Sequence, residues 1–337
     1  MDSLFLYSES NPKFMNINTL RVFTAIAFIC SSITLFSQNS SDTAKGVSEK
    51  NYRIYSVKLG KEVTMQDIAL DVKNYDVVFY GEEHNDSVTH FAEKTLFADL
   101  YNTYKGTITL SMEMFDRDVQ DVMNEYLAGY IREKDFKHDT RVWSNYRDYR
   151  PMVELAKEKH LDVVCANAPS RYTNIAGRKG EKGLTALPES SKKYFAPLPY
   201  DTATGKYYEK LQEMSGHTMA PISKNDTAKL PAMPPMPMMA FDLVVAQSLW
   251  DATMAYSISE YLKAYPAKKV MQVNGKFHSE QGYAVVAQLR KYSPKTKILI
   301  VSSASDDGFP NIDWTKYKDL GDYILITDPK VPKTFKD

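Results

Sequence analysis

Short apolar runs alternate with longer amphipathic stretches over most of the chain, and this pattern predicts the fold. Runs rich in β-branched and aromatic residues predict strands at 77–80, 107–112, 161–166, 270–273, 298–302 and 323–326. The longer stretches predict helices at 87–104, 119–127, 151–159, 241–265 and 283–292, with Pro151 expected in a first helical turn. Such alternation indicates βαβ units, so we expect an α/β fold: a mostly parallel sheet flanked by helices on both faces.

The stretch 177–240 interrupts this alternation. It is rich in glycine and proline, holds one short helical segment at 206–214, and contains the methionine–proline run 230–239. We expect an inserted, smaller helical and loop-rich lobe over the carboxyl-terminal edge of the strands, with 51–176 and 241–330 forming the α/β domain. The methionine–proline run has three interpretations, in order of preference: ordinary packing, contact with a flat apolar ligand, and Cu(I) binding by thioethers.

The first 50 residues differ from the rest. Arg21 precedes an apolar stretch, 22–36, that is shorter than the roughly 20 residues a membrane helix needs. Small polar residues follow it, so residues 1–38 are predicted to be a signal peptide, with Met15 as an alternative start of translation. Residues 39–50 are polar and without periodicity, which predicts a flexible tether. We therefore expect an exported protein of the periplasm or the outer membrane.

Charge and cysteine content narrow the range of partners. The chain carries 42 Lys and Arg against 42 Asp and Glu, so net charge gives no reason to expect nucleic acid or an anionic membrane as the partner. Cys30 lacks a small residue before it, which favours a cleaved soluble form over a lipid anchor at that cysteine. Cys165 follows two valines and is expected to be an inert core thiol.

A glycine–histidine frame occurs twice, each time directly after a predicted strand. The first is Gly81-Glu-Glu-His84 and the second is Gly275-Lys-Phe-His278. Ligands of open parallel sheets bind in the crevice beyond the carboxyl ends of the strands. We therefore expect the two imidazoles to converge at one edge of the sheet.

Other polar side chains fall at the ends of neighbouring strands. Glu82 ends the first strand, Glu113 lies near the end of the second, and Asn167 follows the third. Each has a structural explanation when taken alone; Glu82, for example, favours the positive end of a following helix. Their gathering at successive strand ends favours a functional crevice, because carboxylates and imidazoles bind divalent metals and transfer protons. The catalytic candidates are Glu82, His84, Glu113 and His278, and the metal-ligand candidates among them are His84, Glu113 and His278.

Five motifs resemble those of the ChaN-like haem-binding uptake proteins, part of the wider Tiki/TraB/erythromycin-esterase superfamily. They are Tyr80-Gly-Glu-Glu-His84, Leu110-Ser-Met-Glu-Met-Phe115, Tyr149-Arg-Pro-Met-Val153, Ala166-Asn-Ala-Pro-Ser-Arg171 and Gln247-Ser-Leu-Trp-Asp-Ala-Thr-Met-Ala255. The resemblance runs from about residue 75 to residue 323 and keeps the motifs in one order. It implies an α/β domain with a smaller helical lobe, in an exported or lipid-anchored protein.

The resemblance also implies haem as the cofactor, with another small molecule as the alternative ligand. It implies a homodimer formed through the shared haem, and outer-membrane uptake components as partners. In the family the haem iron is held by tyrosine. For this chain we expect a tyrosine or a histidine on the iron, with Arg150 or Arg171 meeting the propionates. The cofactor-binding candidates in this chain are Tyr146, Tyr149, Arg150, Asn167, Arg171 and Tyr172.

Two functions remain open at this point. The first is an exported haem-binding protein of haem or iron acquisition. The second is a metal-dependent hydrolase of the esterase or peptidase type, in which His84, Glu113 and His278 hold a divalent ion and Glu82 activates water. The first follows from the family resemblance and the second from the chemistry of the predicted site.

Overall fold

The computed structural model of the protein describes residues 46–218 and 241–335. The predicted signal peptide, residues 39–45 of the predicted tether and the methionine–proline run 230–239 lie outside the described residues. Among the helices of the described part, none combines the length and the apolar character needed to cross a bilayer.

The described strands form one sheet of eight, in the order β2-β1-β8-β7-β3-β6-β4-β5. The six strands from β8 to β5 are parallel, while β1 pairs antiparallel with both β8 and β2. Their bounds are β1 (Tyr52–Ser56), β2 (Lys61–Val63), β3 (Val77–Glu82), β4 (Ile108–Asp116), β5 (Val163–Asn167), β6 (Lys269–Gly275), β7 (Ile298–Ser305) and β8 (Tyr323–Thr327). The predicted α/β fold is confirmed, and the six predicted strands are those of the parallel part.

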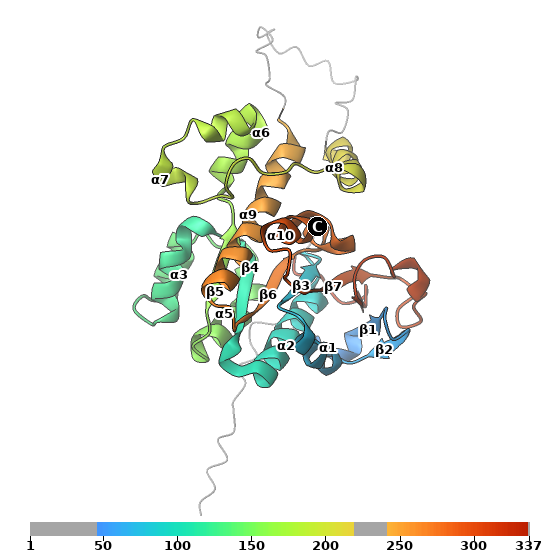
Figure 1. Ribbon diagram of the computed structural model, residues 1–337. Helices are drawn as coiled ribbons and strands as arrows, with labels where there is room; N and C mark the ends of the chain where they lie inside the picture. Colours follow the sequence, from blue (N-terminus) through green and yellow to red (C-terminus); the bar gives the residue numbers. More distant parts are fainter. Residues whose placement is uncertain (1–45, 219–240, 336–337) are drawn as a thin grey trace, which may run out of the picture. The chain divides into compact units, whose positions relative to one another are not determined.

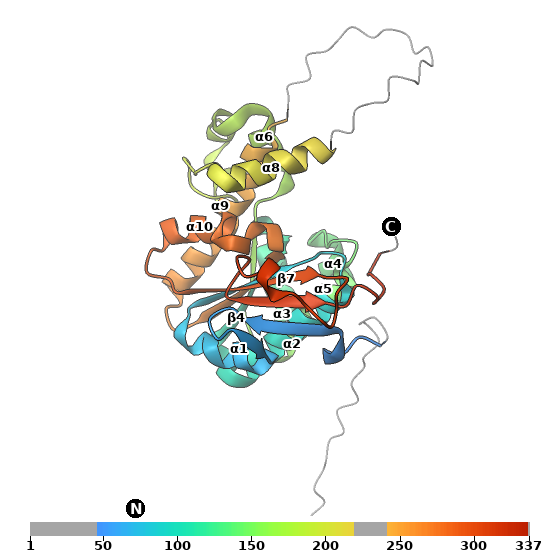
Figure 2. The same cartoon turned by 90° about the vertical axis from the view of Figure 1, so that its right-hand side faces the viewer.

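Helices cover both faces of the sheet (Figures 1 and 2). The first face carries α1 (Met65–Asp71), α2 (Ser87–Tyr104) and α5 (Tyr146–Glu158), and the second carries α9 (Leu243–Ala264) and α10 (Ala284–Tyr292). Successive side chains of a strand point to opposite faces, so Val78 and Tyr80 of β3 join the core under α2 while Val77 and Phe79 join the core under α9. Burial on both faces explains why the central strands read as continuous apolar runs.

Shorter helices complete the described chain. Beside β4 and β5 lie α3 (Gln120–Leu127) and α4 (Glu133–Asp139). Between β5 and α9 come α6 (Ser170–Thr185), α7 (Glu189–Lys192) and α8 (Gly205–Thr218). Single-turn 3₁₀ helices are η1 (Glu49–Asn51), η2 (Val72–Asn74), η3 (Lys105–Thr107), η4 (Arg117–Val119), η5 (Lys276–His278), η6 (Glu280–Gly282) and η7 (Trp314–Lys316).

The helices α6, α7 and α8 gather around the first half of α9 (Figure 1). The core under α6 joins Tyr172 and Phe195 to Leu249 of α9, and it is separate from the two cores that flank the sheet. Tyr207 and Leu211 of α8 pack against Val244 of α9 in another small cluster. The described part of 177–240 is therefore helical and loop-rich, with α6 beginning upstream of that segment at Ser170. Gly180, at φ +61°, breaks α6 in its middle.

One helix begins earlier than the sequence pattern indicates. The proline of α5, Pro151, is the sixth residue of a helix that starts at Tyr146 rather than a first-turn residue, so that expectation is wrong. A proline there removes the backbone bond to the carbonyl of Arg147. The apolar face of α5 compensates, because Tyr149 and Met152 are buried against the sheet.

Candidate functional site

A pocket of about 420 Å³ opens at the carboxyl-terminal edge of β3, β4, β5 and β6. The structure brings together five of the residues that the sequence singled out, Glu82, His84, Glu113, Asn167 and His278. The remaining lining residues are Glu83, Trp143, Gln247, Trp250, Gly275, Lys276 and Phe277. The two imidazoles therefore meet in one crevice, as the repeated glycine–histidine frame predicts.

The first imidazole is held by the carboxylate at the end of β3. His84 Nδ1 lies 2.6 Å from Glu82 Oε1, and the same oxygen accepts a hydrogen bond of 2.6 Å from the Tyr149 hydroxyl. A carboxylate oxygen can only accept, so Nδ1 is the protonated nitrogen and Nε2 carries the lone pair when the ring of His84 is neutral. Burial lowers the pKa of His84, but the hydrogen bond and charge of Glu82 outweigh it and raise this pKa above its ordinary value. The side chain of His84 is 46% exposed, which leaves the ring accessible to a ligand.

The imidazole ring of His84 packs against Gly275, the glycine of the second motif. A Cβ added to Gly275 would lie 2.6 Å from His84 Nε2 and 3.0 Å from its Cε1. Glycine at this position therefore lets the ring approach the end of β6. The N–H of Gly275 also donates to Glu113 Oε2 at 2.8 Å. The two frames and the carboxylate of β4 thus form one packed unit.

The second imidazole has a different support. His278 Nδ1 lies 2.6 Å from Asp251 Oδ1, and Tyr207 donates to the other oxygen of Asp251 at 2.6 Å. His278 Nε2 lies 3.6 Å from Glu113 Oε1. Burial lowers the pKa of His278, but the charges of Glu113 and Asp251 outweigh it and raise the pKa to about 9. At neutral pH this imidazole is therefore a buried cation between two carboxylates.

The sequence pattern did not single out Asp251 as a site residue. The aspartate lies in the middle of α9 and is 1% exposed. Its one signal in the sequence is a carboxylate in an otherwise apolar helix, since buried carboxylates are rare unless they are paired. That signal predicts a partner without saying that the partner is His278.

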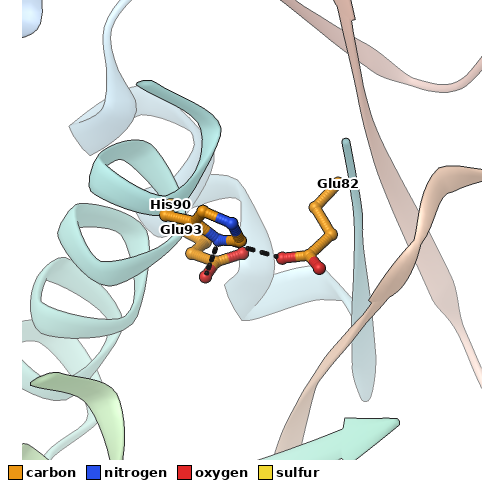
Figure 3. A group of neighbouring side chains, drawn as sticks. All are labelled: Glu82, His90 and Glu93. Carbon is orange, nitrogen blue, oxygen red and sulfur yellow. Dashed lines mark hydrogen bonds and ion pairs between the residues drawn. The ribbon is translucent and has the colours of Figure 1, made fainter. Parts of the chain in front are cut away.

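A second cluster lies behind Glu82, on the side away from the pocket. It comes from α2, which begins at Ser87 because the side chain of Asp86 accepts hydrogen bonds from the first backbone N–H groups. His90 Nδ1 lies 3.1 Å from Glu93 Oε1 and 3.4 Å from Glu82 Oε2 (Figure 3). Neither His90 nor Glu93 follows a strand, so the pattern of polar residues at strand ends does not identify them. The signal in the sequence is a histidine and a glutamate three residues apart within a buried helix.

Charges in this cluster are strongly interdependent. Burial favours neutral Glu82, but the charge of the nearby His90 and the hydrogen bond from His84 hold the pKa of Glu82 well below its usual range. Burial also opposes the charge on His90, yet the two carboxylates hold the pKa of His90 well above its usual range. Burial and the charge of Glu82 raise the pKa of Glu93 well above normal. The surroundings therefore favour the ionised form of Glu82, the protonated form of His90 and the neutral form of Glu93.

The three tyrosines predicted to hold haem iron lie outside the pocket lining. Tyr146 is buried among Phe115 and Phe136, and Tyr172 packs against Phe195. Tyr149 lies closest to the site, but its hydroxyl donates to Glu82 and the side chain is 1% exposed. Asn167 is the one residue of the predicted cofactor set that lines the pocket.

The two predicted propionate partners are engaged elsewhere. Arg150 donates to Glu133 Oε1 at 2.6 Å on the outer side of α5. Arg171 donates to Asp118 Oδ2 at 2.6 Å and lies over the ring of Tyr172. Neither side chain lines the pocket.

The predicted metal trio does not form a compact set of ligands. Its members, His84, Glu113 and His278, share the pocket, but each imidazole is held at Nδ1 by a separate carboxylate. Within the described ranges, the group of three whose ligand atoms all lie within 4.8 Å of one another is Glu82, His90 and Glu93.

The fold of this chain is similar to that of known proteins. The structure of ChaN of Campylobacter jejuni with cofacially bound haem is similar over 83% of this chain and 99% of that chain, with a TM-score of 0.60 and 17% identity. The type III effector HopBA1 is less similar, with a TM-score of 0.41 and 11% identity over 78% of this chain and 92% of that chain. The structure of an erythromycin esterase EreC mutant in its open conformation has a TM-score of 0.41 and 10% identity over 75% of this chain and 77% of that chain. No curated protein matches the chain. A sequence model of the family described as haem-binding uptake, Tiki superfamily, ChaN matches residues 68–289, and the chain belongs to that family.

Proposed function

We propose that this protein binds haem and serves in haem or iron uptake as an exported protein. The match to the haem-binding uptake family over residues 68–289 carries the proposal, because that range contains the strands β3, β4, β5 and β6 and every residue lining the candidate pocket. Export is supported by the apolar stretch 22–36 near the start of the sequence. From the same family we infer that two copies share the bound haem.

The side chains of the pocket fit a haem group. Trp143, Trp250 and Phe277 give apolar walls for a porphyrin, and the pocket volume of about 420 Å³ is that of a small-molecule site. His84 offers Nε2, and its Nδ1–H is anchored on Glu82, as in histidines that bind metals. Lys276, which donates to Glu83 and lines the pocket, is a candidate partner for a propionate.

Within this proposal each side chain has a defined task. Haem supplies an iron whose redox potential depends on its axial ligand and on the polarity around it. Of the tyrosines and histidines expected to hold the iron, His84 is the residue that would bind it, because Tyr146, Tyr149 and Tyr172 are at most 5% exposed. Glu82 increases the basicity of His84 through the hydrogen bond to Nδ1.

Titration with haemin tests the proposal. The purified protein is expected to give a saturable Soret shift, and His84→Ala is expected to weaken binding or move the band. His138→Ala is the matched control, since the side chain of His138 is 87% exposed on α4. Size-exclusion chromatography with and without haemin tests the shared haem. The absence of a saturable Soret change in the wild-type protein would refute haem binding.

Hydrolysis is a second candidate, and the pair of carboxylate-held imidazoles favours it. His84 has an accessible Nε2 that can take a proton from water, while His278 is a cation fixed by Asp251 and Glu113. Such a pair can supply a general base and a group that stabilises developing negative charge. A panel of esters and peptides, assayed with and without a chelator, tests this candidate. Any activity is expected to be lost in both His84→Ala and His278→Ala, and activity that survives both changes would exclude the site.

A further inference from the structure

The cluster behind Glu82 has the spacing of a metal site. Glu82, His90 and Glu93 are 1%, 4% and 0% exposed, and Figure 3 shows the imidazole and the two carboxylates turned toward one another. His90 Nδ1 lies 3.1 Å from Glu93 Oε1 and 3.4 Å from Glu82 Oε2. Two ligands each roughly 2.0–2.2 Å from Zn²⁺ lie about 3.4 Å apart at the tetrahedral angle. A divalent ion therefore fits between these atoms with little movement.

The imidazole of His90 is oriented for coordination. Its Nε2–H donates to the backbone carbonyl of His84 at 3.1 Å, so Nδ1 faces the two carboxylates. Histidines that bind metals are fixed in the same way, with the second ring nitrogen donating to a carbonyl or carboxylate. His90 and Glu93 are three residues apart on α2 and so share one face of the helix.

Two buried oxygens provide an independent indication. Glu82 Oε2 and Glu93 Oε2 are buried and have no hydrogen-bond partner in the described part of the chain. Glu82 uses its other oxygen for His84 and Tyr149, which leaves Oε2 directed at the cluster. Buried carboxylates are normally paired or bound to metals, because an unpaired buried charge is costly.

From these observations we propose that Glu82, His90 and Glu93 bind one divalent transition-metal ion of the kind that accepts mixed imidazole and carboxylate ligands, such as Zn²⁺ or Mn²⁺. Two carboxylates, one neutral imidazole and a divalent ion sum to zero charge, which suits a fully buried site. The ion fixes Glu82 and, through Glu82, His84 at the wall of the pocket. The site shares Glu82 with the pocket, but His90 and Glu93 do not line it, so metal binding can be tested without haem.

Metal uptake by the whole protein tests the proposal. The chain is dialysed against a chelator, equilibrated with Zn²⁺ or Mn²⁺, and analysed for bound metal and for thermal unfolding. One ion per chain and a higher Tm are expected. Glu93→Gln and His90→Gln are expected to weaken binding more than about 100-fold, since loss of a group that only orients a ligand already costs about 10–100-fold. His278→Gln and His138→Gln are the matched controls and are expected to keep the ion.

The alternative to an ion is a proton shared between the two carboxylates. Glu93→Gln resembles the protonated acid and is expected to fold, which far-UV circular dichroism checks. If it does not fold, X-ray absorption on the Zn²⁺-loaded wild-type protein decides, because this site has one imidazole whereas a site between His84 and His278 has two. A chain that takes up no stoichiometric ion, an ion lost in His278→Gln but kept in His90→Gln, or a spectrum with two imidazoles would each overturn the proposal.

Discussion

Alanine in place of Gly275 tests whether the close contact between the two glycine frames positions His84. The backbone of Gly275, at φ −52° and ψ 133°, accepts alanine without strain. The new Cβ would lie 2.6 Å from His84 Nε2, a distance that requires movement. Because the side chain of His84 is 46% exposed, the ring has room to turn outward, and in turning it breaks its hydrogen bond to Glu82.

The expected loss of stability follows from two opposing effects. A hydrogen bond to a charged group contributes about 1.5–3 kcal/mol, with the lower figure suited to a half-exposed ring. Replacing glycine by alanine in a compatible conformation stabilises by about 0.4–1 kcal/mol, since it restricts the unfolded chain. Gly275→Ala is therefore expected to lower the free energy of unfolding by about 1 kcal/mol and to lower the pKa of His84 toward its ordinary value.

Urea unfolding and NMR titration of the histidines measure both changes. The pKa of His84 is raised in the folded protein, so its charge stabilises the fold at low pH and this contribution is lost as pH rises through the raised value. The difference between wild type and Gly275→Ala should thus be largest below about pH 6.5. Gly106→Ala is the control, because nothing lies within 4 Å of its added Cβ. An unchanged pKa of His84 in Gly275→Ala would refute the reasoning.

Three further changes probe the supports around the site. Asp251→Asn should lower the pKa of His278 from about 9, which NMR titration measures. Because this pKa is raised in the folded protein, the free energy of unfolding of the wild type should fall as the pH rises from about 6.5 to 9. The fall should be smaller in Asp251→Asn. Tyr149→Phe should lose about 1–2 kcal/mol in urea unfolding, because its hydroxyl donates to a buried carboxylate. Gly81→Ala should destabilise by about 1–3 kcal/mol or more, since its Cβ would lie 2.9 Å from the backbone Cα of Lys276, which cannot turn aside. Stabilities equal to wild type in the last two variants would contradict these contacts.

The sequence predicts the parallel sheet and the gathering at its edge, because both follow from local patterns. Buried strands are apolar runs, and parallel strands place whatever follows them at one edge. The hairpin of β1 and β2 escaped prediction because both strands are short and lie on the antiparallel side of the sheet, where β1 alternates buried and half-buried residues and β2 is mostly exposed. Pairing with β8, rather than local composition, makes β1 a strand.

Supports that come from distant parts of the chain escaped prediction. Asp251 reaches His278 from 27 residues away, and no local pattern gives the rotation of α9 that brings them together. The tyrosines and arginine of α5 show the same limit. Their residue types suit a haem site, but the helix turns Tyr146 into the core and Arg150 toward Glu133. Residue type predicts which ligands a side chain can bind, whereas the rotation of the helix about its axis decides which neighbours the side chain contacts.

The two glycine–histidine motifs are alike in sequence, but their histidines, His84 and His278, have different surroundings and different roles. His278 is 7% exposed and fixed between two carboxylates, so its charge acts on the pocket without leaving its place. His84 is exposed, and its single support, Glu82, also belongs to the cluster with His90 and Glu93. Any change of charge in that cluster, by a proton or by an ion, therefore reaches the pocket through one carboxylate and one imidazole. It follows that changes at His90 should alter the pKa of His84 more than that of His278.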